Sequence, residues 1–147
     1  QRLKQWMLQT VDDDMQAFNR IIDARRMAKG SESERALRDA AILEASKAAT
    51  LTPLSVVQGT PILLELASRV VEHGNPSSLS DGAVAALVAS AAAEGAYYNV
   101  LINLRDFGQS APEQEFASET RAQAEKLIGV VRERSEEIKK MAMASLS

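Results

Sequence analysis

Three consecutive carboxylates, Asp12, Asp13 and Asp14, interrupt an apolar helical pattern near the start of the chain. At about 100° per residue, the apolar side chains of this stretch share one broad helix face. They are Leu3, Trp6, Met7, Val11, Met15, Phe18, Ile21 and Ile22. Asp12 and Asp13 lie about 130° from the centre of that face, whereas Asp14 lies only about 30° from it. We therefore expect the first two acids to be solvated and Asp14 to point into the core.

A buried carboxylate at Asp14 would be suited to proton transfer. Burial without a partner disfavours the charged form and raises the pKa of a carboxyl group. A carboxyl group with a raised pKa can both donate and accept a proton near neutral pH, as a general acid/base must. The alternative is a structural ion pair, for which Arg25 on the same face is available. The helical pattern alone supports both interpretations.

Two amides interrupt a second apolar segment, residues 82–104. Asn99 and Asn103 are four residues apart and share one helix face. Buried amides need hydrogen-bond partners, which could be neighbouring helix ends or a polar heterocycle. Asp81 lies about five turns earlier on that face, where a carboxylate also favours the start of a helix. His73 directly precedes a turn, and we expect it to be exposed.

The composition excludes several other kinds of site. The 147-residue chain has no cysteine, so it can form no disulfide, no cysteine-ligated zinc site and no thiol nucleophile. His73 is the only histidine, which excludes a two-histidine zinc site within one chain and argues against a Ser-His-Asp triad. A net charge of −3 and the scarcity of aromatic residues argue against nucleic-acid binding. We expect neither a metal ion nor nucleic acid as a ligand.

Helices must position these residues. Ala, Leu, Glu, Arg and Lys dominate, and no stretch shows the alternation of a strand. We predict helices at about residues 2–27, 31–52, 54–72, 81–105 and 113–143. Ser31 or Ser33 caps the second helix, Pro53 ends it, and Pro61 kinks or interrupts the third. The short connections predict an all-α antiparallel bundle of about five helices, with the apolar helix near 81–105 at its centre.

That apolar helix is dense in small residues, mostly alanine. Small residues could allow close packing inside the bundle or across a homodimer interface, or they could leave room for a flat ligand. The same stretch lacks the Leu, Ile and Phe density of a membrane span, so we interpret it as a helix of a soluble protein. No segment near the start has the pattern of a signal peptide. We expect a cytoplasmic protein that does not bind a membrane.

A family resemblance emerges from the same segments. Residues 95–106 (GAYYNVLINLRD) closely resemble a segment of the formimidoyltransferase-cyclodeaminase proteins. Further segments agree in order and spacing: 11–18 (VDDDMQAF), 52–55 (TPLS), and 74–75 (GN) followed by 80–81 (SD). The resemblance covers essentially the whole chain. It implies an all-α cyclodeaminase domain over residues 1–147 that assembles as a homodimer or a higher homo-oligomer.

The resemblance also implies an activity and assigns residues to it. In the family this domain converts 5-formimidoyltetrahydrofolate to 5,10-methenyltetrahydrofolate and ammonia, a lyase step of histidine degradation, and the tetrahydrofolate derivative enters as substrate. The family's catalytic aspartate is the second acid of an Asp-x-Asp pair and corresponds to Asp14, the acid that the helical pattern turns inward. The substrate-binding residues that it implies are Phe18, Asp81, Asn99 and Asn103.

The chain also departs from the family pattern. Family members have a Pro-Gly-Gly-Gly segment and an apolar helix upstream, and Gly82 stands where we expect a bulkier residue. We therefore expect a domain that lacks its N-terminal Gly-rich segment and first helix, with a fused or associated formimidoyltransferase domain as a candidate partner. Two other functions stay open. One is a methenyltetrahydrofolate cyclohydrolase, which uses water as the nucleophile, and the other is a non-catalytic helical interaction module.

Overall fold

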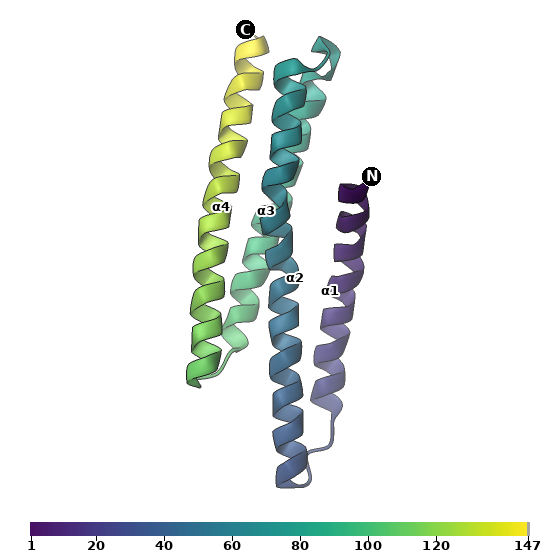
Figure 1. Ribbon diagram of the computed structural model, residues 1–147, viewed down its shortest axis with the longest axis vertical. Coiled ribbons are helices and arrows are strands. Elements are labelled where there is room, and N and C mark those ends of the chain that lie inside the picture. The colour runs from purple at the N-terminus through teal and green to yellow at the C-terminus, as the bar shows by residue number, and fades with distance from the viewer. Residues whose placement is uncertain (147) are drawn as a thin grey trace.

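The computed structural model describes residues 1–146 as an all-α bundle without strands in that range (Figure 1). The four long helices are α1 (Arg2–Arg26), α2 (Glu32–His73), α3 (Leu79–Asn103) and α4 (Ala111–Leu146). Two short 3₁₀ turns, η1 (Pro76–Ser78) and η2 (Leu104–Asp106), flank α3. The predicted fold class is confirmed.

The N-terminus of α2 forms where the sequence predicts it. Ser31 is the N-cap, and its hydroxyl accepts a hydrogen bond from the backbone N–H of Glu34. The Glu34 carboxylate in turn accepts from the N–H groups of Ser31 and Gly30, at 2.9 and 2.8 Å. These backbone hydrogen bonds lower the pKa of Glu34. This reciprocal capping box ends the short loop after α1 and fixes where α2 begins.

The predicted break at Pro53 is wrong, because α2 continues through Pro53 and Pro61 as one helix of 42 residues. A proline lacks the N–H that would bond to the carbonyl four residues earlier, so Pro53 leaves the carbonyl of Ala49 without its helical donor. The side chain of Asn103 on α3 supplies the replacement, donating from Nδ2 to the Ala49 oxygen at 2.8 Å. A tertiary hydrogen bond thus compensates the backbone that the proline disrupts.

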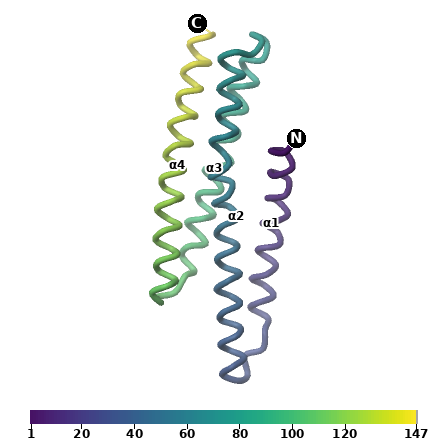
Figure 2. Tube along the Cα trace, viewed as in Figure 1, coloured from purple at the N-terminus to yellow at the C-terminus, as the bar shows by residue number. Residues whose placement is uncertain are grey.

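The long helix α2 organises the bundle. It contacts α1, α3 and α4, with α1 on one side and α4 on the other (Figures 1 and 2). α1 runs beside only one end of α2, and the other end of α2 extends well past the N-terminus (Figure 2). The main core lies between α2, α3 and α4 and contains Val57, Leu64, Ile128, Val131 and Ile138. The side of α2 that faces α1 is less completely covered.

α3 is apolar nearly all round, as predicted, and it packs against both α2 and α4. α3 buries small residues against its neighbours and exposes larger ones, namely Val84, Leu87, Val88, Tyr98 and Ile102. Glycine at residue 82 has a packing reason, because a Cβ there would lie 2.9 Å from a Val71 methyl and 3.2 Å from the Ala67 carbonyl oxygen. By length and composition alone, α2 and residues Pro76–Asp106 could each cross a membrane, a test that core helices of soluble proteins also pass.

Candidate functional site

A long groove of about 850 Å³ lies between α1, α2 and α3. α1 contributes Trp6, Met7, Thr10, Val11, Asp14 and Met15. α2 contributes Thr52, Pro53, Val56, Thr60, Leu63, Leu66, Ala67 and Val70, and α3 contributes Asp81, Gly82, Ala85, Val88, Ala89, Ala92, Ala96 and Asn99. Its size falls in the range of small-molecule sites, and such sites combine an apolar lining with a few polar groups, as this one does.

The contacts between α1 and α2 place Asp14 at one end of the groove. The indole of Trp6 lies directly against Gly59 of α2, so these two residues are level with each other. The two helices run in opposite directions (Figure 1). Eight residues further along α1, Asp14 is therefore level with Thr52, which lines the same groove.

The contacts between α2 and α3 bring Asn99 to the same end and leave Asp81 at the other. Because Asn103 bonds to Ala49, Asn99 one turn earlier is level with Pro53. Asp81 lies in the first turn of α3, about 27 Å from Asn99 along the helix. The structure thus groups Asp14 and Asn99, while Asp81 belongs to a distant part of the groove.

Asp14 faces the groove but is exposed, so the expectation that it is buried in the core is wrong. The helical pattern placed its direction correctly, since the neighbouring Val11 and Met15 line the same groove. Those two apolar side chains are themselves 60% and 57% exposed, because they face the open groove. The alternative pairing with Arg25 is not formed either: within residues 1–146, no ion pair or side-chain hydrogen bond involves Asp14.

The flanking acids behave as expected. Asp12 and Asp13 are both exposed, and neither lines the groove. Asp13 accepts a hydrogen bond from the side-chain amide of Gln9 at 3.0 Å, one turn away on the solvent side. Of the three consecutive carboxylates, only Asp14 is therefore directed at the groove.

The two predicted amides have different environments. Asn103 does not line the groove, and its amide is engaged with the Ala49 carbonyl, which was the structural alternative. Asn99 lines the groove beside Pro53, is exposed, and has no side-chain hydrogen bond to any residue in the described part of the chain. Asn99 is the amide that stays available to a ligand.

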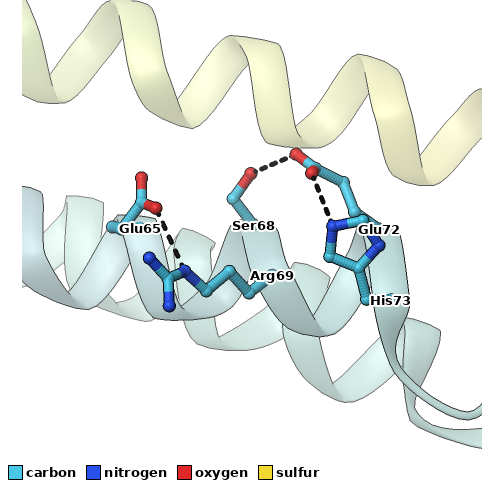
Figure 3. A network of polar contacts seen from close by, with 5 residues as sticks. All are labelled: Glu65, Ser68, Arg69, Glu72 and His73. Atoms are coloured by element: carbon cyan, nitrogen blue, oxygen red, sulfur yellow. Dashed lines mark hydrogen bonds and ion pairs between the residues drawn. The ribbon is translucent and has the colours of Figure 1, made fainter.

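Phe18 and His73 do not line the groove. Phe18 is 62% exposed and does not line the groove. His73 is exposed, as expected, and belongs to a surface network at the C-terminal end of α2 (Figure 3). There its Nε2 lies 3.5 Å from Glu72, which also accepts from Ser68 at 2.8 Å. This network belongs to the helix surface and does not line the groove.

The polar groups of the groove are mainly hydrogen-bond acceptors. The hydroxyls of Thr10, Thr52 and Thr60 all donate to carbonyls of their own helices, at 2.9, 3.1 and 2.8 Å. Their oxygens are therefore left with only acceptor capacity, like the two carboxylates of the groove. Within residues 1–146, no lysine or arginine lines the groove. The groove suits a flat, largely apolar ligand that carries N–H donors or a positive charge and holds any anionic part outside.

Among the lining residues that the sequence did not point to are Trp6 and Thr52. Trp6 was assigned only to the apolar face, although it is four residues from Thr10 and eight from Asp14, which places all three along one ridge of α1. Thr52 was placed at a helix end and in a segment of the family resemblance, but it was given no role in the site. A ridge of one aromatic, one hydroxyl and one carboxylate at four-residue spacing is a signal that could have found Trp6. Within residues 1–146 no cluster of three or more His, Asp or Glu side chains could hold a metal ion.

Comparison with known proteins identifies the family. A family model described as formiminotransferase-cyclodeaminase matches residues 1–126. This chain belongs to that family. The resemblance of residues 11–18 and 95–106 is thereby confirmed, and the chain is related to folate enzymes of one-carbon chemistry.

The relatives include both activities that the sequence left open. A methenyltetrahydrofolate cyclohydrolase of Methylorubrum extorquens is 33% identical over 86% of this chain, which spans 59% of that protein. A formimidoyltransferase-cyclodeaminase of Gallus gallus is 31% identical over 80% of this chain and 21% of its own length. A formiminotetrahydrofolate cyclodeaminase structure from Thermotoga maritima matches 99% of this chain and 67% of its own, with a TM-score of 0.81 at 23% identity. That likeness supports the fold.

Proposed function

We propose that the groove binds a reduced folate and that Asp14 transfers protons in the cyclodeamination of 5-formimidoyltetrahydrofolate. One observation carries the proposal: in a chain of this family, the unpaired carboxylate of Asp14 and the unpaired amide of Asn99 lie at the same end of an acceptor-lined groove of about 850 Å³. The N–H groups of a reduced pterin match acceptors such as Asp14 and Thr52. The anionic glutamate of the folate would extend out of the groove, which has no basic lining residue within residues 1–146.

The chemistry requires one group that both accepts and donates a proton. N10 of the substrate attacks the formimidoyl carbon, and a C–N10 bond forms as the carboxylate of Asp14 takes the proton from N10. The protonated Asp14 then gives this proton to the amino group of the tetrahedral intermediate, whose C–N bond breaks to release ammonia. A neutral substrate takes up one further proton overall, because the methenyl product is a cation. A carboxylate beside this developing positive charge also stabilises it.

The second candidate is methenyltetrahydrofolate cyclohydrolase, favoured by the Methylorubrum extorquens relative and its larger matched share of the chain. Here water adds to the cationic methenyl carbon and Asp14 takes a proton from it. The C–N5 bond then breaks to give 10-formyltetrahydrofolate, with net release of one proton. The same groove and carboxylate serve both reactions, so the choice between them depends on the substrate.

Parallel assays on the purified protein separate the two candidates. Ammonia release is measured with 5-formimidoyltetrahydrofolate, and loss of the methenyl chromophore is measured with 5,10-methenyltetrahydrofolate. We expect ammonia release at the higher kcat/KM. Faster methenyl hydrolysis without ammonia release would select the cyclohydrolase instead. Neither activity, together with no tetrahydrofolate binding by calorimetry, would leave the interaction module and overturn both enzymatic proposals.

A further inference from the structure

Trp6 separates the groove from a second hollow. Its side chain lines the groove on one side of α1 and an open hollow of about 530 Å³ on the other, which Arg2 and Gln58 also border. Trp6 is the only tryptophan of the chain and, within residues 1–146, the only aromatic residue that lines the groove. Its indole is therefore the one flat π surface that a ligand in the groove can meet.

The position of this indole depends on Gly59. A Cβ at residue 59 would overlap the ring directly, and two further ring atoms, Cζ2 and Cζ3, would lie at 2.9 Å. Only glycine lets the ring lie flat against the backbone of α2, although glycine in a helix interior is unfavourable. Gly95 on α3 provides the contrast, because a Cβ there would meet nothing within 4 Å. Glycine at 59 therefore has a packing reason that glycine at 95 lacks.

We propose that Trp6, held in place by Gly59, is the stacking surface for the aminobenzoyl ring of the folate substrate. This inference rests on the proposed function. Trp6 lies about 12 Å from Asp14 along α1. The donor-rich pterin and the reacting atoms N5 and N10 are placed near Asp14 and Asn99. The aminobenzoyl ring, which is bonded to N10, then extends along the groove toward Trp6. Arg2 borders the hollow beyond Trp6, and its positive charge suits the glutamate that follows the ring.

The test compares three variants and two probe ligands. Trp6→Leu removes the aromatic face and keeps apolar bulk, Gly59→Ala displaces the indole, and Gly95→Ala is the matched control. Calorimetry measures the Kd of tetrahydrofolate and of 6-methyltetrahydropterin, which has the reduced pterin but no aminobenzoyl ring. Aromatic contacts of this kind change affinity by about three- to tenfold. We expect that weakening for tetrahydrofolate in Trp6→Leu and Gly59→Ala, no change in Gly95→Ala, and no change for the pterin in any variant.

The single tryptophan gives a second readout. Tetrahydrofolate should quench the fluorescence of Trp6 in the parent protein and in Gly95→Ala, and should quench it less in Gly59→Ala. Far-UV circular dichroism establishes that each variant is folded, and Trp6→Leu carries the test if Gly59→Ala does not fold. Unchanged tetrahydrofolate affinity in a folded Trp6→Leu variant, or equal weakening for the pterin, would overturn the stacking role alone. If the parent protein does not bind tetrahydrofolate, the proposed function fails and this inference fails with it.

Discussion

Both sides of α2 carry apolar residues, but the neighbouring helices cover the two sides to different extents. On one side, α2 packs against α3 and α4, and Val57, Val100 and Val131, one from each of these helices, are fully buried. On the other side, α1 and α3 stand apart around the groove, and apolar residues such as Val11 and Val88 are 60% and 64% exposed. Apolar residues recur at helical spacing on both sides. Periodicity identifies the face of a helix that avoids water, but not whether a neighbour covers it.

This contrast separates stability from function. Removing a side chain from the packed side should lower the free energy of unfolding, because the cavity left behind cannot fully collapse. Changing Asp14 or Asn99 should alter binding or turnover with little effect on folding, because both side chains are exposed and make no side-chain hydrogen bond within residues 1–146.

Asp14→Asn should lower turnover by about 10²- to 10⁴-fold, the usual contribution of a general acid/base. An amide is nearly the same size as the carboxylate but cannot take the N10 proton. Because Asp14 is exposed and unpaired within residues 1–146, the Tm should not change. The measurement is kcat beside a thermal melt, with Asp13→Asn as the matched control that keeps full turnover. Full turnover in Asp14→Asn, with normal folate binding, would remove Asp14 from the mechanism.

Ile128→Ala tests the packed side. Ile128 of α4 is 1% exposed in the main core, so truncation should lower the free energy of unfolding by about 2–5 kcal/mol. Ile102→Ala on α3 is the matched control, because Ile102 is 55% exposed and lines no part of the groove. Chemical denaturation measures both variants, and calorimetry should find the Kd of tetrahydrofolate unchanged in each. A large fall in affinity for Ile128→Ala would show that the two sides are coupled.

Asn103→Ala tests the hydrogen bond from the Asn103 side chain of α3 to the Ala49 carbonyl of α2. Loss of the amide leaves the buried Ala49 carbonyl without a donor and should lower the free energy of unfolding by about 1–3 kcal/mol. In the Pro53→Ala background, the N–H restored at residue 53 can bond to that carbonyl, so the same substitution should be less destabilising. A double-mutant cycle measured by denaturation gives the difference. Equal effects in both backgrounds would contradict the compensation of Pro53 by Asn103.

Local features of the fold were predictable from the sequence. The capping residue Ser31 is followed at the favoured spacing by Glu34, so the start of α2 depends only on neighbouring residues. The continuity of α2 through Pro53 was not predictable, because the compensating donor on Asn103 lies 54 residues away in the sequence. The pattern of a single helix carries no information about such a partner. It therefore predicts a helix break at Pro53, which the structure does not have.

The candidate site was predictable in direction but not in depth. The helical pattern correctly turned Asp14 to the same side as Val11 and Met15. It could not show that this side is open, because exposure depends on how far α1 stands from α3. For the same reason Asn99 and Asn103 looked equivalent, although one turn of helix separates a groove residue from one that bonds to the neighbouring backbone.

The ion pair between Glu94 and Arg132 gives the smallest effect and tests the outer surface of the packed side. Arg132 of α4 donates from Nε and Nη2 to the two carboxylate oxygens of Glu94 on α3, at 2.6 and 2.8 Å. The hydrogen bond from Arg132 is the main cause that lowers the pKa of Glu94. The pair therefore stabilises the fold at pH values above the unfolded carboxyl pKa, and this contribution is lost as the pH falls through the lower, folded value.

The test is the difference in unfolding free energy between the parent protein and Glu94→Gln, measured from pH 7 to pH 3. At pH 7 we expect a difference of up to about 1 kcal/mol, since the Arg132 side chain is half exposed and solvent screens the pair. The difference should shrink toward pH 3 as Glu94 is protonated. Glu136→Gln breaks the looser, exposed pair with Lys139 within α4 and should have no measurable effect at any pH. A pH-independent difference for Glu94→Gln would contradict the ion pair. It would mean that the Glu94 side chain stabilises the fold by packing between α3 and α4 and not through its charge.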